Sequence, residues 1–213
     1  SCSLVQRGAL PLLPEAVRTR SALTCGADLV FALPAPCACA GAEAFARAGV
    51  ALLAAAGCDG LVFGAETPDA ALLMEAAELL DSGSYRAALK AQLAGGARSF
   101  AAARQAAAAQ LASDERVAAL LDKPNNNLAV EYCRAIRSLA PRMEAYPLPR
   151  QGANHGEALH SAHGQFASAS ALRKLWAEGG ADAVAPYVPE AVFPLYQEAY
   201  AAGQYTDFSA AGR

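Results

Sequence analysis

A helix followed by a strand, over residues 124–150, constrains the fold more than any other stretch of this chain. Pro124 followed by asparagines is typical of a helix start, because proline resists helix before it and an asparagine side chain can cap the first N–H groups. Apolar side chains then recur at helical spacing from Leu128 to Leu139, which indicates one buried face. The next run predicts a strand that ends at Arg150.

Apolar runs upstream extend this alternation. Residues 27–34 and 61–63 each form a short apolar run between turn residues, which predicts buried strands, and residues 41–56 between them predict a helix. Strands that alternate with helices predict an α/β fold with a parallel, doubly wound, Rossmann-like sheet. Residues 68–122 show helical patterns with no strand among them, which indicates a helical insertion whose charges form a solvated face.

Composition narrows the functional classes. The 213 residues are enough for one α/β domain with a full core. A net charge of −3 argues against this segment alone as a strong nucleic-acid binder, because phosphate neutralisation needs clustered lysine and arginine. It is compatible with a local basic patch. No apolar run reaches transmembrane length without interruption, so we expect a cytoplasmic protein with no membrane partner.

Cysteine and histidine give no strong metal motif. The six cysteines fall mostly in apolar stretches without paired C-x-x-C knuckles, which predicts reduced, buried thiols. Cys37 and Cys39 as a redox or metal pair are the less common alternative. His155, His160 and His163 lie close together in the sequence, but no cysteine or carboxylate pair accompanies them at ligand spacing. We therefore expect no metal ion held by these side chains.

The helix–strand unit also suggests a ligand site. In an open α/β sheet, ligands bind outside the carboxyl ends of the strands, where helix N-termini also point. Asn125 would then hydrogen-bond a base or ribose, and Arg150 would face a phosphate. On spacing alone, a capping asparagine and a solvated arginine are the more common arrangement. Glu66, which follows a predicted strand, is either a ribose or adenine contact or the cap of the next helix.

Short stretches along nearly the whole chain resemble one family, the bacterial tRNA(Met) cytidine acetate ligases. These belong to the nucleotidyltransferases with a His-x-Gly-His motif. Each stretch is short, and the likeness depends on their order and spacing, including the gap between Asn125 and Arg150. The matching stretches are 4–8, Arg18 with 22–23, 26–30 with 33–34, 57–59 with 63–66, 124–126, Arg150 with His155, 168–170 with Arg173, and 186–189.

This resemblance implies a domain organisation and a reaction. Residues 1–185 would form the nucleotidyltransferase-type domain, with the insertion at about 68–122, and residues 186–213 would begin a C-terminal helical extension. ATP and acetate would form acetyl-adenylate, with Mg²⁺ accompanying the triphosphate. The acetyl group would then move to N4 of the wobble cytidine of elongator tRNA(Met).

The resemblance also assigns site residues. Three of them would contact ATP: Gly64, Asn125 and Arg150. A glycine at a strand end lets a nucleotide approach the backbone closely. Ser168 and Arg173 resemble a phosphate-binding serine and arginine at a helix start, with an ordinary N-cap and a surface charge as the evenly weighted alternative. The loop residue His155 would lie near the triphosphate.

Departures from the family keep other functions open. The His-x-Gly-His motif does not occur in these 213 residues, so the catalytic residues are unknown, and we expect the first strand–helix unit and most of the C-terminal extension to be missing. Residues unusual for the family stand at four positions: Ala9, Glu15, Ala129 and Asn154. The alternatives are an adenylyltransferase that acts on a small phosphorylated metabolite, or a remnant that binds nucleotide or tRNA without catalysis.

Overall fold

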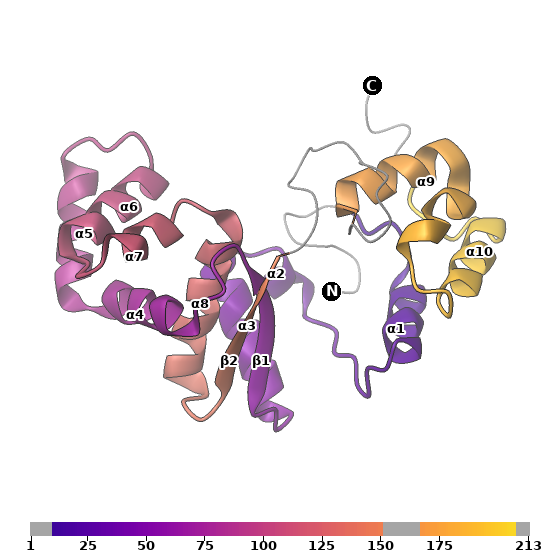
Figure 1. Cartoon of the computed structure of the whole chain (residues 1–213), viewed down its shortest axis with the longest axis horizontal. Coiled ribbons are helices and arrows are strands. Elements are labelled where there is room, and N and C mark those ends of the chain that lie inside the picture. Colours follow the sequence, from indigo (N-terminus) through magenta and orange to yellow (C-terminus); the bar gives the residue numbers. More distant parts are fainter. Residues whose placement is uncertain (1–9, 151–166, 208–213) are drawn as a thin grey trace. The chain divides into compact units, whose positions relative to one another are not determined.

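The described part of the chain forms two compact units. A computed structural model describes residues 10–150 and 167–207. Residues 40–150 make up one unit, and the described residues up to 39 and from 167 onward make up the other. Figure 1 shows helices in both units and a pair of strands in the first. The candidate site depends chiefly on the unit of residues 40–150.

The strands of this unit pair in parallel. β1 (Gly60–Ala65) lies beside β2 (Glu144–Pro149). Helix α3 (Ala42–Ala55) precedes β1, and helix α8 (Pro124–Leu139) precedes β2. A parallel pair needs a crossover connection, so helix and strand alternate as the sequence predicts. The helix and strand predicted over residues 124–150 are both confirmed.

The two faces of the sheet differ in exposure. Phe63 and Ala65 are buried, whereas Val62, Tyr146 and Leu148 are exposed among the described residues. Successive side chains of a strand point to opposite faces. Helices α3 and α8 therefore cover one face, as Figure 1 shows, and the opposite face presents apolar side chains.

Four helices connect β1 to α8. They are α4 (Ala70–Asp81), α5 (Gly83–Ala94), α6 (Phe100–Leu111) and α7 (Glu115–Leu120). Each begins after an aspartate or serine whose side chain accepts a backbone hydrogen bond, which satisfies one of the first N–H groups. No strand lies among them, which confirms the predicted helical insertion.

A buried carboxylate ties the insertion to α8. The side chain of Glu131 on α8 is only 4% exposed, and it accepts hydrogen bonds from Arg104 of α6 at 2.6 Å and from Arg134 at 2.7 Å. Arg134 also donates to Asp81 at the end of α4, at 2.7 Å. The prediction that the charges of the insertion form a solvated face is therefore wrong for Arg104. A buried charge needs such partners, because desolvation alone is costly.

The other unit is helical in its described residues. It contains α1 (Glu15–Thr24), α2 (Ala35–Ala38), α9 (Ala169–Val184) and α10 (Phe193–Ala201), with a short 3₁₀ turn at Ala185–Tyr187. Its core includes Trp176, whose ring contacts three tyrosine rings edge-on. At Gly180, α9 bends with a φ of 68°, and a Cβ there would lie 2.6 Å from the ring of Tyr200.

The strand predicted at residues 27–34 does not form. This segment has no regular secondary structure, and Leu29, Val30 and Phe31 are exposed. An apolar run is a strand only when another strand satisfies its backbone groups. Within the described residues, the sheet pairs β1 with β2 alone, so no strand pairs with this segment.

The buried carboxylate gives a prediction about stability. Glu131→Ala leaves two arginines without their shared partner, and we expect it to lower the free energy of unfolding by about 3 kcal/mol. Glu78→Ala is the matched control, because the side chain of Glu78 is 71% exposed and 3.7 Å from Arg137. The control should cost less than about 1 kcal/mol. Urea unfolding measures both, and equal losses would contradict the structural role of Glu131.

Candidate functional site

Three predicted site residues meet at one edge of the sheet in the unit of residues 40–150. Gly64 is the penultimate residue of β1, Arg150 directly follows β2, and Asn125 lies in the first turn of α8. Arg150 donates from Nη1 to Oδ1 of Asn125 at 2.9 Å, and its backbone N–H donates to the carbonyl of Ala65 at 3.1 Å. The structure thus places Asn125 and Arg150 in contact at the carboxyl ends of the strands.

Gly64 leaves room for the arginine. A Cβ at this position would lie 3.3 Å from Cγ of Arg150, which is tighter than an ordinary van der Waals contact. Gly64 is exposed, so a ligand can also approach its backbone closely. A larger residue at position 64 would displace the side chain of Arg150 and would also cover the backbone of β1 at this position.

The carboxylate of Glu66 joins the end of β1 to the start of α8. Its Oε1 accepts from the side-chain amide of Asn125 at 2.6 Å and from the Asn125 backbone at 3.2 Å, and Oε2 accepts from the Asn126 backbone at 2.7 Å. Partial burial works to raise the pKa of Glu66, but these hydrogen bonds outweigh it and hold the pKa below its usual value. Glu66 is therefore a stable anion at the positive end of α8.

The structure excludes two capping alternatives that the sequence left open. The N-cap residue of α8 is Lys123, and no side chain of the cap itself bonds the helix. Asn125 does not cap α8, because Glu66 accepts the hydrogen bonds of its N-terminus instead. Glu66 is also not the cap of the next helix, α4, whose first turn is bonded by Asp69. The side chain of Asn125 instead bridges Glu66 to Arg150.

A second asparagine holds the same corner of the fold. Asn126 is 1% exposed. Its Oδ1 accepts from the backbone of Thr67 at 2.9 Å, and its Nδ2 donates to the Thr67 hydroxyl at 3.1 Å. Sequence reasoning missed this contact. The only available signal was the polar pair Glu66 and Thr67 after a predicted strand, together with the asparagine pair at the predicted helix start.

The two described candidates for phosphate binding lie at the start of another helix. Ser168 directly precedes α9 and Arg173 lies within it, in the other unit. The hydroxyl of Ser168 accepts from the backbone of Ala171 at 3.2 Å, so it is the N-cap of α9. A phosphate role for the two residues stays a prediction. His155, together with Asn154, lies outside the described residues.

The structure describes several of the side chains considered as thiols or metal ligands. Over residues 10–150 and 167–207, no three His, Cys, Asp or Glu side chains gather as metal ligands would. Among the cysteines described, Cys133 is buried, but Cys25 and Cys58 are exposed, so the prediction of buried thiols is wrong for those two. Burial raises the pKa of Cys133 to about 12.

No helix in the described ranges has the length and apolarity to cross a membrane.

Sequence comparison places this geometry among known proteins. A family profile described as HIGH nucleotidyl transferase matches residues 1–211. A tRNA(Met) cytidine acetate ligase from Syntrophotalea carbinolica is 40% identical over 177 residues, which cover 82% of this chain and 42% of that protein. A protein of the same name from Caldanaerobacter subterraneus subsp. tengcongensis is 34% identical over 207 residues, which cover 96% of this chain and 51% of that one.

Solved structures agree with the sequence relatives. The apo crystal structure of Thermotoga maritima TmcAL matches with a TM-score of 0.86 at 30% identity, covering 95% of this chain and 49% of that one. The structure of the same protein bound with alpha-thio ATP matches with a TM-score of 0.82 at 28% identity, covering 95% and 48%. The fold is therefore the Rossmann-like nucleotidyltransferase fold. The chain spans about half the length of the relatives it matches.

The bridge through Asn125 gives a prediction about the amide that donates to Glu66. Asn125→Asp sets a carboxylate against that of Glu66, and we expect it to lower the free energy of unfolding at pH 7 by about 1 kcal/mol. Adding Glu66→Gln supplies an amide donor and should recover part of the loss. Urea unfolding at pH 7 compares the variants. An Asn125→Asp protein as stable as the original would show that the amide hydrogen bond to Glu66 does not stabilise the fold.

Proposed function

Because the chain belongs to the HIGH nucleotidyl transferase family, we propose that it binds ATP where Gly64, Asn125 and Arg150 meet. The observation that carries this proposal is the contact between Arg150 and Asn125 at the carboxyl ends of two parallel strands. Ligands of open α/β sheets bind at this edge. A related structure was solved with alpha-thio ATP, which supports the choice of nucleotide.

We propose that the bound ATP activates acetate. The names of the relatives support this reaction. A carboxylate oxygen of acetate attacks the α-phosphorus, the bond to the β-phosphate breaks, and pyrophosphate leaves. The N4 amine of the wobble cytidine of elongator tRNA(Met) then attacks the acetyl carbonyl of the adenylate. AMP leaves and N4 loses a proton.

The residues of this chain act by positioning and electrostatics. In the proposal, Arg150 neutralises phosphate charge, Asn125 hydrogen-bonds the base or ribose, and Gly64 lets the nucleotide lie against the strand end. The family resemblance makes Ser168, Arg173 and His155 further candidates for phosphate contacts. Glu66 contacts no ligand in this scheme and keeps Asn125 oriented through its amide.

Further parts of the proposal concern organisation and the metal ion. We propose that residues 1–185 belong to the nucleotidyltransferase domain and that residues 186–213 begin a helical extension. The described residues offer no ligand cluster for Mg²⁺. Mg²⁺ that accompanies the triphosphate would take its ligands from phosphate and water. The RNA substrate implies a cytoplasmic protein.

The reaction can be tested directly. The chain spans about half the length of its relatives and lacks the His-x-Gly-His motif, so we expect these residues alone to be inactive. A protein of full family length that contains them, incubated with ATP, acetate and elongator tRNA(Met), should form N4-acetylcytidine at the wobble position, detected by mass spectrometry. Acetate-dependent exchange of pyrophosphate into ATP, measured without tRNA, tests the first half-reaction alone. ATP binding without either activity would favour a non-catalytic binder. Exchange that depends on a phosphorylated metabolite instead of acetate would favour an adenylyltransferase.

Arg150 can be tested against a matched arginine. We expect Arg150→Ala to weaken ATP binding about tenfold to a hundredfold, because a charge-assisted phosphate contact contributes about 1.5–3 kcal/mol. Arg142→Ala is the control, since Arg142 is exposed and precedes the same strand, at its opposite end. Calorimetric titration with ATP measures both. Equal affinities for the two variants would remove Arg150 from the site.

A further inference from the structure

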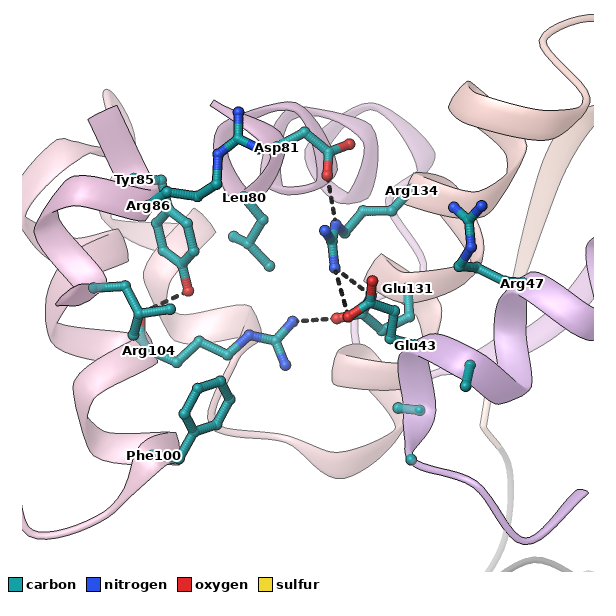
Figure 2. A pocket seen from close by; sticks show the side chains of 14 residues that line it. Glu43, Arg47, Leu80, Asp81, Tyr85, Arg86, Phe100, Arg104, Glu131 and Arg134 are labelled. Carbon is teal, nitrogen blue, oxygen red and sulfur yellow. Dashed lines mark hydrogen bonds and ion pairs between the residues drawn. The ribbon is translucent and has the colours of Figure 1, made fainter. Parts of the chain in front are cut away.

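A cavity of about 560 Å³ lies in the unit of residues 40–150, away from Gly64, Asn125 and Arg150. Its walls come from α3, the helical insertion and α8. The lining side chains that matter here are Arg47, Arg86, Phe100, Arg104, Glu131 and Arg134. Figure 2 shows Arg104 and Arg134 converging on Glu131, with Phe100 and Arg86 from the insertion and Arg47 from α3. Its volume lies within the range of small-molecule sites.

The arginines of the cavity differ in their pairing. Arg104 and Arg134 are held by the carboxylate of Glu131, at 2.6 and 2.7 Å. The guanidinium of Arg47 instead donates to the hydroxyl of Ser138 at 3.2 Å. Arg86 has no side-chain hydrogen bond or ion pair within the described part of the chain. Two guanidinium groups that no carboxylate neutralises therefore line one cavity, and such groups favour an anion, above all phosphate.

An exposed aromatic ring lines the same cavity. Phe100 is the first residue of α6, and it is 62% exposed. Nucleobases stack on aromatic side chains whatever their sequence, because every base has a π-face. A ring and two unneutralised guanidinium groups around one cavity match the two parts of a nucleotide, the base and the phosphate.

We propose that this cavity binds one unstacked nucleotide of the RNA substrate, with its base on Phe100 and its phosphate on Arg86 and Arg47. The inference rests on the proposed function for the identity of the RNA. Proteins that read RNA sequence act mainly on single-stranded loops, whose bases can be splayed out and stacked. The wobble cytidine lies in such a loop. The lining carries four arginines against three carboxylates, Glu43, Asp81 and Glu131, so its formal charge is +1 in a chain whose net charge is −3.

The test uses a fluorescently labelled anticodon stem-loop RNA and fluorescence anisotropy. We expect Phe100→Leu, which keeps an apolar side chain but removes the ring, to weaken RNA binding about fivefold to a hundredfold. Phe100→Tyr should restore affinity to within about twofold, because it restores a stacking surface. Titration of each variant with ATP reports whether the unit is folded.

A second variant tests the phosphate contact. Arg86→Ala should reduce the slope of log affinity against log salt concentration by about 0.7, the value for one phosphate of a single strand. Arg142→Ala, an exposed arginine outside the cavity, is the matched control and should leave the slope unchanged.

Three results distinguish the possibilities. If Phe100→Leu and Arg86→Ala bind the stem-loop as tightly as Arg142→Ala, the cavity is not the RNA site. If free CMP displaces the stem-loop at an equal concentration, the cavity is a mononucleotide site and the RNA assignment is overturned. If acetate-dependent exchange is absent while RNA binding still depends on Phe100, the proposed reaction fails and the cavity assignment stands.

Discussion

The carboxylate of Glu66 at the N-terminus of α8 is the interaction on which the candidate site depends. It accepts three hydrogen bonds from the first turn of that helix, and its negative charge lies where the helix dipole favours an anion. The helices α4–α7 separate Glu66 from α8 in the sequence. The contact therefore fixes the start of α8 against the end of β1 across this insertion, and with it the position of Asn125.

Much of the architecture around this contact is local in origin, and the sequence predicts it. Helical spacing and capping residues identify α8 and the insertion helices, because each signal lies within one or two turns of the element it marks. The general rule for ligands of open α/β sheets then places Asn125 and Arg150 at one edge, where the structure brings them into contact.

Contacts between distant residues were not predictable in the same way. Which side chain bonds the first turn of α8 depends on where β1 ends in space, so a capping asparagine and a bridging one share the same local sequence. The local sequence around a helical glutamate is likewise the same whether its carboxylate faces water or contacts two arginines, as that of Glu131 does. The strand predicted at residues 27–34 is wrong for a related reason. A strand requires a pairing partner, and apolar character alone does not specify one.

Helix α8 contributes to both the proposed ATP site and the arginine-lined cavity. Asn125 lies in its first turn, and Glu131 lies six residues further on, about 9 Å along the helix axis. The two residues share one continuous helix, so under these proposals a ligand that shifts the Glu131 end would also reorient the amide of Asn125. Communication between the two sites then requires no hinge or loop closure. Under the two binding proposals, the tilt of this single helix would couple nucleotide binding to RNA binding.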